Sequence, residues 1–415
     1  MIGIDIEALK NEIKNKRYQW SSGPTPLSEL SEDEIKKLFK VPIKKEEIER
    51  MTSEIRKAEA SEVEMGITYE YPKKWDWRNI KNGDKYENWT TPIKEQKKCG
   101  ACVAFGVVAA VESNLKIFRK NPKKDPNLSE ADIFFCACSK CCETGMEPKV
   151  ALDYVMYSGV ADDGCYKYNP KDQNCNPCKN RKKRVVKIQN WRTISTVDNA
   201  KDWIYNHGPV LCLMEVYSDF LTYTGGIYRH VNGDKVGDHY ICIVGYDNIN
   251  ECWICKNSVG GTKWGEKGWF RISYGECGIG ESRSFNTTEF PSIDDSIIMP
   301  KDGNVKVTFK SKDAKYTNEF SIYEPVKKSI FKAKDSEVGN SFNIGPFKSG
   351  QTLVFALKSP EGTFYTNPSL NPDACVHVKK KQINNDTFEF GWEDQYGLGD
   401  WDFNDLIVDI QIPIV

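Results

Sequence analysis

Cys102 has the surroundings of a thiol nucleophile. It follows Gln96-Lys-Lys-Cys99-Gly-Ala and begins an apolar stretch, residues 102–118, that has helical periodicity. At the start of a helix, the dipole favours the thiolate over the thiol. The side-chain amide of Gln96 and the backbone N–H of Cys102 are suited to stabilise an oxyanion. The segment therefore predicts covalent catalysis by sulfur.

A general base for this thiol has to be one of the four histidines. His239 follows Asp238 and opens an apolar strand, and Asn257 closes the next apolar run. If the two strand ends are adjacent, the amide of Asn257 holds the imidazole in the tautomer that faces sulfur. His207 precedes Gly208-Pro209 and is expected at a helix end or in a loop. His230 and His377 carry no motif and are expected at the surface.

Composition and periodicity divide the chain into parts that must position these residues. Residues 1–70 are charged, lack cysteine and are predicted to be helical, with a capping box of Ser31 and Glu34 and a second helix over residues 45–60. Residues 71–288 are helical at first and strand-rich after Gly208, which predicts an α+β domain. Residues 289–300 are predicted to be a linker, and residues 301–415 an all-β sandwich.

The bulk properties exclude several classes of function. With 58 basic and 59 acidic side chains, the net charge of −1 argues against a nucleic-acid partner. No apolar run reaches the roughly 18–20 residues of a membrane span. All cysteines but Cys375 lie between Cys99 and Cys277, a density that favours disulfides and an extracellular or cell-surface location. No signal peptide is visible, which would favour the cytoplasm for a complete chain.

Three blocks of this sequence resemble the papain family of cysteine peptidases. They are Gln96–Cys102 with Ala104-Phe105, then Gly237-Asp238-His239, and lastly Lys256-Asn257-Ser258 with Trp264-Gly-Glu-Lys-Gly268. The order Cys, His, Asn fits, and the intervals are close to the family's roughly 130–150 residues. The resemblance covers about residues 71–288.

The resemblance implies a two-lobed α+β domain, with a helical left lobe and a β-barrel-like right lobe. It also implies a cysteine endopeptidase that acts on polypeptides through a Cys102 acyl-enzyme and needs no cofactor. In this reaction His239 protonates the leaving amine and later activates water, Asn257 orients His239, and Gln96 stabilises the oxyanion.

Two positions depart from the family pattern. Val103 and Val259 replace customary tryptophans, and the second normally shields the His–Asn hydrogen bond from water. A His–Asn hydrogen bond that is more exposed to water predicts a modest rate of catalysis. The departures leave open a catalytically impaired binding protein on the same fold, and the acyl-enzyme also suits a peptide ligase or transpeptidase.

The same resemblance assigns a substrate groove. Backbone groups near Gly145 would pair with the substrate as an added strand. Asp238, beside the base, would also contact substrate, and Met146 and Ser282 would border the pocket for the second side chain before the cut. A methionine there favours an apolar side chain, whereas Glu147 nearby would admit a basic one.

The resemblance also implies disulfides from Cys99 to Cys142 and from Cys136 to Cys175. It leaves Cys277 without its usual partner. An alternative remains open, because Cys138-x-x-Cys141 and Cys175-x-x-Cys178 form a paired pattern that could hold zinc.

Residues 1–70 are similar to a short prosegment. We expect a latent enzyme that is cut somewhere around Ala60–Tyr71. The alternative is a plain helical extension without a regulatory role.

Near the C-terminus, acidic residues alternate with glycine turns in a pattern that suits Ca²⁺. The stretch resembles a D-x-D-F-N-D signature of β-sandwich domains appended to microbial surface and adhesion-type proteins, which implies a cell-surface or protein partner. The predicted ligands of a structural Ca²⁺ are Asp394, Asp400, Asp402, Asn404 and Asp405. The alternative is an acidic, solvated turn.

Overall fold

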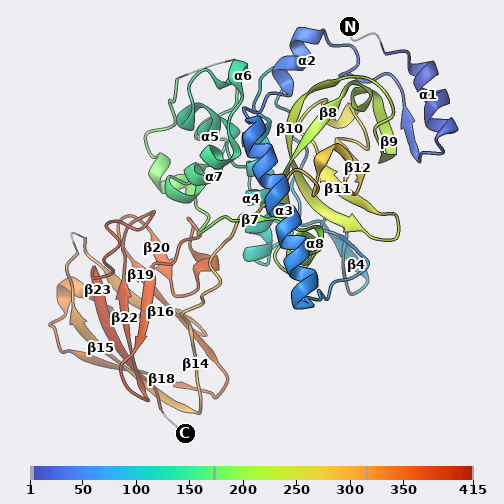
Figure 1. Ribbon diagram of the computed structural model, residues 1–415. Helices are drawn as coiled ribbons and strands as arrows, with labels where there is room; N and C mark the ends of the chain where they lie inside the picture. Colours follow the sequence, from blue (N-terminus) through green and yellow to red (C-terminus); the bar gives the residue numbers. More distant parts are fainter. Residues whose placement is uncertain (1–3, 172–173, 315, 414–415) are drawn as a thin grey trace. The chain divides into compact units, whose positions relative to one another are not determined.

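The computed structural model describes residues 4–171, 174–314 and 316–413. The chain forms two compact units, which we describe separately (Figure 1). Unit 1 comprises Met1–Lys179 and Asn190–Glu289, and unit 2 comprises Asn180–Gln189 and Phe290–Val415.

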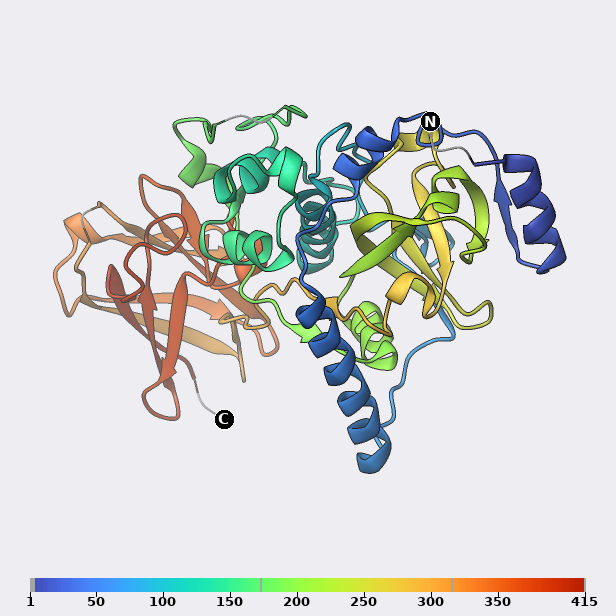
Figure 2. The ribbon, with the colours of Figure 1, turned by 45° about the horizontal axis from the view of Figure 1, so that its top comes forward.

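The helices of unit 1 gather around α4 (Cys102–Phe118), whose residues from Cys102 to Lys116 are all buried. The helix is buried on every side because it lies between the other helices and the sheet (Figure 2). Helices α5 (Glu130–Ala137) and α7 (Pro148–Tyr157) pack against it. Helix α6 (Cys141–Thr144) contacts α2 (Glu32–Leu38), and α8 (Val197–Asn206) contacts β8 (Val210–Tyr217) and β10 (Lys235–Asp247). The nucleophile candidate is thus the first residue of the central helix.

The strands of unit 1 form a nine-stranded sheet within the described residues, in the order β1-β9-β12-β11-β10-β8-β13-β7, with β2 added to β10. Antiparallel pairing of β10 with both β8 and β11 fixes the register of His239, which lies opposite Met214. The strands are β1 (Trp20–Ser22), β2 (Lys74–Asp76), β7 (Thr193–Ile194), β8 (Val210–Tyr217), β9 (Tyr223–Tyr228), β10 (Lys235–Asp247), β11 (Cys252–Lys256), β12 (Trp269–Ser273) and β13 (Phe285–Asn286). The α+β prediction is confirmed.

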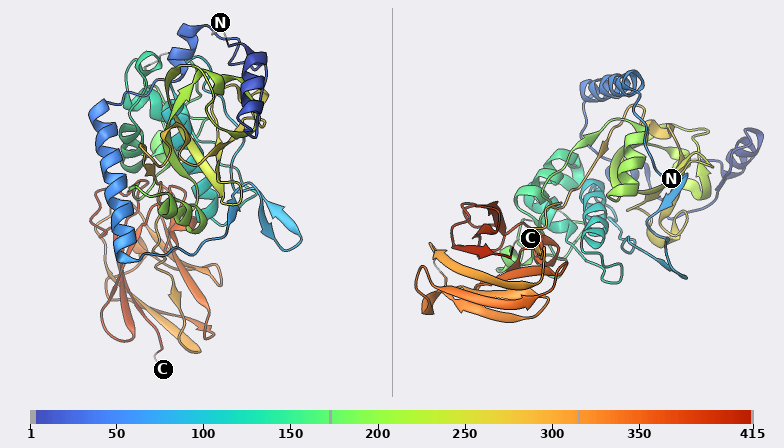
Figure 3. Two further views of the ribbon diagram at one scale, coloured as in Figure 1. Left: turned by 45° about the vertical axis from the view of Figure 1, so that its right-hand side comes forward. Right: turned by 90° about the horizontal axis from the view of Figure 1, so that it is seen from below.

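The N-terminal segment is folded onto unit 1. Its elements are α1 (Ile6–Asn15), β1, α2 (Glu32–Leu38) and α3 (Lys45–Met65). Strand β1 extends the sheet by pairing with β9, and the predicted capping box of Ser31 and Glu34 begins α2. Helix α3 lies on the outside of unit 1, has Ile55 as its buried residue, and ends at Gly66 in a left-handed conformation (Figure 3). The helix is five residues longer than the 45–60 predicted.

Unit 2 is all-β, as predicted. Two five-stranded sheets enclose one apolar core, among the described residues. The first sheet contains β14 (Ile297–Ile298), β16 (Glu319–Glu324), β17 (Lys328–Lys332), β19 (Thr352–Lys358) and β20 (Thr363–Tyr365). The second contains β15 (Gly303–Ser311), β18 (Ser341–Phe347), β21 (Val378–Gln382), β22 (Thr387–Trp392) and β23 (Leu406–Gln411).

Two segments differ from the expected organisation. Strand β14 lies within residues 289–300, which we expected to be a linker, because Ile297 and Met299 are buried in the core of the sandwich. Residues 180–189 belong to unit 2 although the peptidase region surrounds them in sequence. The backbone N–H of Lys187 donates to the carbonyl of Asp373, a long-range contact that local composition does not signal.

Within the part of the chain that the structure describes, no helix has the length and apolarity to cross a membrane.

Candidate active site

Cys102 occupies the N-terminal end of α4 and has no exposed surface. Burial raises the pKa of its thiol to about 12, and the smaller, opposing effects come from the backbone of Tyr240, Val103 and Cys102 itself. The contact with Tyr240 places the sulfur beside the strand that carries His239. In this form the nucleophile is a neutral thiol, because desolvation exceeds the helix-dipole effect.

His239 and Asn257 meet across the adjacent strands β10 and β11. The distance from His239 Nε2 to Asn257 Oδ1 is 2.9 Å, and both residues are buried. Because an amide oxygen can only accept, Nε2 carries the proton and Nδ1 has the lone pair. Nδ1 is buried with no hydrogen-bond partner among the described residues, as suits a base that awaits a proton. Burial lowers the pKa of His239 to about 4, and the bond to Asn257 opposes this effect.

Gln96 is held from both ends of its amide. Ser258 Oγ donates to Gln96 Oε1 at 2.7 Å, and Gln96 Nε2 donates to the carbonyls of Cys99 at 2.9 Å and Leu38 at 3.1 Å. The N–H group that we expect to stabilise an oxyanion is therefore already used by a carbonyl of the N-terminal segment.

Three consecutive residues of the N-terminal segment occupy the groove. The Phe39 carbonyl accepts from the Asp238 backbone N–H at 3.0 Å, and the Phe39 ring meets the His239 ring edge-on at 5.2 Å. A Cβ at Gly145, whose φ is +75°, would lie 1.8 Å from the Lys40 carbonyl oxygen. Leu38, Phe39 and Lys40 therefore lie against the residues that the sequence assigned to substrate.

The predicted pocket residues have an unforeseen neighbour, Arg283. Met146 is 1% exposed and Ser282 is half-buried, while Arg283 is 1% exposed and donates from Nη1 to Ser282 Oγ at 3.2 Å. The Arg283 guanidinium also lies 3.6 Å from the Asp238 carboxylate and 3.3 Å from that of Glu215. Sequence reasoning missed this arginine because its only signal is its position next to Ser282.

In this form of the molecule the His239–Asn257 bond is buried, although Val259 replaces the customary tryptophan. Val259 is 2% exposed and packs in the main core with Trp264, which is fully buried. Asn257 Oδ1 also accepts from the Ser258 N–H at 2.8 Å. The bond is shielded because Phe39 covers His239 in this form of the molecule.

A buried ionic network behind the site was also missed. Lys94 Nζ lies 2.8 Å from Glu112 and 2.9 Å from Glu130, and Lys256 Nζ donates to Thr91 Oγ1, which donates to Glu112. Burial raises the pKa of Glu130 to about 7, opposed by Lys94. Because Lys256 precedes Asn257, this network anchors the strand end that carries the amide.

The disulfides in the structure are Cys99–Cys142, Cys136–Cys175, Cys138–Cys141 and Cys165–Cys178. The first two are the pairs that the family resemblance implies. The zinc alternative fails here, because all four cysteines of the two C-x-x-C motifs are in disulfides and offer no thiolate. Cys277 is free and buried, and Cys102 is also unpaired.

The remaining histidines lie outside this site. His207 caps the C-terminal end of α8, as predicted. His230 stacks on Tyr217 and bonds to Asp219, and His377 is 0% exposed with Nε2 2.9 Å from Asp373. The surface location expected for His377 is therefore wrong, because it is buried with the carboxylate of Asp373, whereas His230 is partly exposed.

The acidic residues predicted to bind Ca²⁺ do not all converge. Carboxylates of Asp400 and Asp402 lie together with that of Glu393, which we did not predict. Asp394 instead accepts from Asn318 Nδ2 at 3.0 Å, and Asp405 accepts from the Asp394 N–H at 2.9 Å. Neighbours in an extended chain point to opposite sides, so Glu393 and Asp394 face different surroundings. Asn404 contributes its N–H to Asp402 at 3.1 Å.

Comparison with known proteins agrees with this geometry. Residues 71–287 match the papain family of cysteine proteases, and residues 335–412 match a domain of unknown function, DUF4114. Cathepsin Z of Onchocerca volvulus is 33% identical over 217 residues, which is 48% of this chain and 70% of that protein. Pro-cathepsin H of Mus musculus is 34% identical over 229 residues, 52% of this chain and 65% of that protein.

Solved pro-enzymes share the fold. The structure of proCathepsin B S9 from Trypanosoma congolense superposes with a TM-score of 0.52 at 20% identity, over 69% of this chain and 98% of that one. Digestive procathepsin L2 from the larval midgut of Tenebrio molitor gives 0.53 at 23% identity, over 68% and 88%. The match of residues 71–287 to the family model and the 33% identity to cathepsin Z lead to one conclusion: this chain belongs to the papain family of cysteine proteases.

Proposed function

We propose that this chain is a latent cysteine endopeptidase, in which Cys102 attacks peptide bonds after the N-terminal segment leaves the groove. The observation that carries the proposal is that two consecutive backbone carbonyls of the N-terminal segment accept hydrogen bonds from donors of the groove. Leu38 accepts from Gln96 and Phe39 accepts from the N–H of Asp238. The hydrogen-bond donors of the groove can therefore hold the backbone carbonyls of a polypeptide.

The proposed reaction begins when release of the segment lets water and substrate reach Cys102. Proton transfer from Cys102 Sγ to His239 Nδ1 gives a thiolate and an imidazolium. The thiolate adds to the scissile carbonyl carbon, and the oxyanion accepts from Gln96 Nε2 and the Cys102 N–H. His239 then gives its proton to the leaving amine as the C–N bond breaks, and a thioester remains on Cys102.

Deacylation uses the same groups in reverse. His239 Nδ1 takes a proton from water, the hydroxide oxygen adds to the thioester, and the C–S bond breaks to release the acid. Asn257 keeps the proton on Nε2 throughout, so that Nδ1 remains the reacting nitrogen. His239 Nδ1 returns the proton that it took from water to the departing Cys102 sulfur as the acid leaves, which restores the thiol and the neutral imidazole.

Residues 66–70 are the proposed place of the activating cut. Helix α3 ends at Met65, and beyond it Gly66, Ile67, Thr68 and Glu70 are exposed. Exposed irregular backbone is where proteolysis concentrates, because a protease needs an extended strand.

The proposal is tested by labelling with iodoacetamide, followed by location of the adduct by mass spectrometry. The intact chain is compared with the chain nicked within residues 66–70 and freed of the segment, and the hydrolysis of a peptide library is measured for both. We expect the nicked enzyme to label at Cys102 and to cut peptides, and His239→Ala to abolish both. Equal rates of labelling and hydrolysis for the intact and nicked chains would contradict the proposed latency. Rapid labelling of Cys102 without hydrolysis would instead indicate a catalytically impaired binding protein on this fold.

A further inference from the structure

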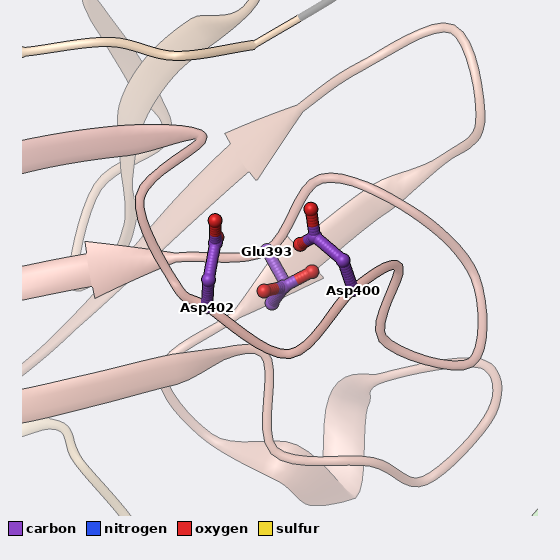
Figure 4. A group of neighbouring side chains, drawn as sticks. All are labelled: Glu393, Asp400 and Asp402. Carbon is purple, nitrogen blue, oxygen red and sulfur yellow. The ribbon is translucent and has the colours of Figure 1, made fainter.

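Unit 2 carries a cluster of three carboxylates that the peptidase reaction does not use. Glu393 follows strand β22, and Asp400 and Asp402 come from the loop that leads to β23. One oxygen from each side chain lies within 4.8 Å of the others, and Figure 4 shows the Glu393 carboxylate between the two aspartates. Exposed acidic groups often gather in this way without a ligand, so the cluster needs a second observation.

That observation is the buried, unpartnered oxygen of Glu393. The residue is 0% exposed, whereas Asp400 and Asp402 are exposed. Its Oε1 accepts from the Phe403 N–H at 2.7 Å, which fixes the orientation of the carboxylate. Its Oε2 has no hydrogen-bond partner among the described residues. An anionic oxygen in such a place is costly unless a cation pairs with it.

The backbone approaches Oε2 closely at Gly399, where a side chain would crowd this oxygen. A Cβ at Gly399 would lie 2.7 Å from Glu393 Oε2. The nearest imidazole, that of His377, does not compete for the cluster. Its Nε2 pairs with Asp373, and its Nδ1 lies 3.1 Å from the backbone carbonyl of Glu393.

We propose that Glu393, Asp400 and Asp402 bind one Ca²⁺ ion in unit 2. The donors are all hard carboxylate oxygens, with no thiolate or imidazole nitrogen, which disfavours zinc and copper. Two ligands lie on an exposed loop, and Ca²⁺ tolerates the irregular geometry and added water that such a loop gives. Mg²⁺ requires near-ideal octahedral geometry and is therefore the poorer fit.

The site is tested in the full chain carrying Cys102→Ala, which prevents self-cleavage and leaves unit 2 unchanged. After treatment with a chelator, CaCl₂ is titrated by calorimetry, and MgCl₂ is titrated separately. We expect one Ca²⁺ per chain, and a weakening of at least about tenfold in Asp400→Asn and in Asp402→Asn as ligand charge is lost. Asp335→Asn, which replaces an exposed carboxylate of the same unit, is the matched control and should bind Ca²⁺ as the parent does.

Terbium gives an independent readout, because Trp401 lies between the two aspartates in sequence and Trp392 precedes Glu393. Excitation of tryptophan should give Tb³⁺ luminescence that CaCl₂ displaces and MgCl₂ does not. If Glu393→Gln does not fold, the variants Asp400→Asn and Asp402→Asn still test the proposal. Absence of Ca²⁺ binding, or unchanged affinity in both Asp400→Asn and Asp402→Asn, would overturn the proposal.

Discussion

The side-chain amide of Gln96 donates a hydrogen bond to the backbone carbonyl of Leu38 at 3.1 Å. This contact joins the proposed oxyanion donor to a segment that lies far away in the sequence. The next carbonyl, that of Phe39, is held by the backbone of Asp238. The proposed latency therefore rests on competition between the segment and a substrate for the same donors, and we expect it to weaken when single contacts are removed.

Replacing Gln96 should reduce the chemical step of the activated enzyme. Loss of one oxyanion donor costs roughly 10²–10³ in kcat, so we expect a fall of that size in Gln96→Ala, with KM nearly unchanged. Ser258→Ala is the matched comparison. It keeps the amide but removes the 2.7 Å bond that orients it, a loss of about tenfold or less. Equal rates for Gln96→Ala and the parent would remove Gln96 from the mechanism.

Phe39 should carry much of the affinity of the segment for the groove. Its ring is 2% exposed and packs edge-on against His239. Truncation of a buried phenylalanine costs about 3 kcal/mol or more, so Phe39→Ala should raise the population of the open form by roughly 100-fold. The rate of Cys102 labelling in the intact chain measures that population. Val63→Ala in α3 is the control, because Val63 is 83% exposed and should change nothing.

Acid should weaken the docking of the segment through Glu34. Its hydrogen bond with Lys98, together with the capping contacts of Ser31, lowers the pKa of Glu34 to about 2. Because the pKa of this carboxyl is lowered in the docked form, Glu34 contributes fully to docking of the segment above about pH 4.5. The contribution is lost as the pH falls toward 2. The dissociation constant of a synthetic segment of residues 1–70 for the nicked enzyme, measured across this range, should rise as the pH falls.

Two variants separate this effect from other titrations. Glu34→Gln should bind more weakly at neutral pH and lose most of the dependence between pH 4.5 and 2. Glu32→Gln should behave as the parent, since the pKa of Glu32 is lowered chiefly by Lys36 of the same helix, a pair that persists after release. The pH dependence that remains in Glu34→Gln should come from His239. Burial lowers the pKa of His239 to about 4, so protonation between about pH 6.5 and 4 also favours release of the segment.

The sequence pointed to the side chains that we propose as catalytic because each stands in a local block with a fixed order. Cys102 begins a helix with a strong apolar pattern, His239 precedes the apolar part of β10, and Asn257 directly follows β11. The groove contacts could not be predicted, because the acceptors are backbone carbonyls of Leu38 and Phe39. Every residue has such a carbonyl, so nothing in the side-chain pattern marks these two.

Burial was harder to predict wherever it depends on distant chain segments. The burial of the His239–Asn257 bond in this form could not be foreseen from Val259, because Phe39, a residue distant in sequence, covers His239. His377 was placed at the surface because Asp373, its partner, lies in irregular backbone between strands. The sequence identified the acidic stretch near the C-terminus but predicted Asp394, not Glu393, as a ligand. The pattern at the end of a strand does not indicate which of two neighbouring side chains faces the loop.

The disulfide Cys99–Cys142 should stabilise unit 1 more than the short bridge Cys138–Cys141 does. The first spans 43 residues and the second spans 3, and the entropy of closing such loops corresponds to about 4 and about 1.5 kcal/mol. Cys99→Ala with Cys142→Ala should therefore lower the Tm of unit 1 by roughly 10 °C, measured by differential scanning calorimetry of the intact chain. Cys138→Ala with Cys141→Ala, the matched pair, should lower it by less than half as much. Equal shifts for the two pairs would show that local packing, rather than loop closure, sets the contribution of the longer bridge.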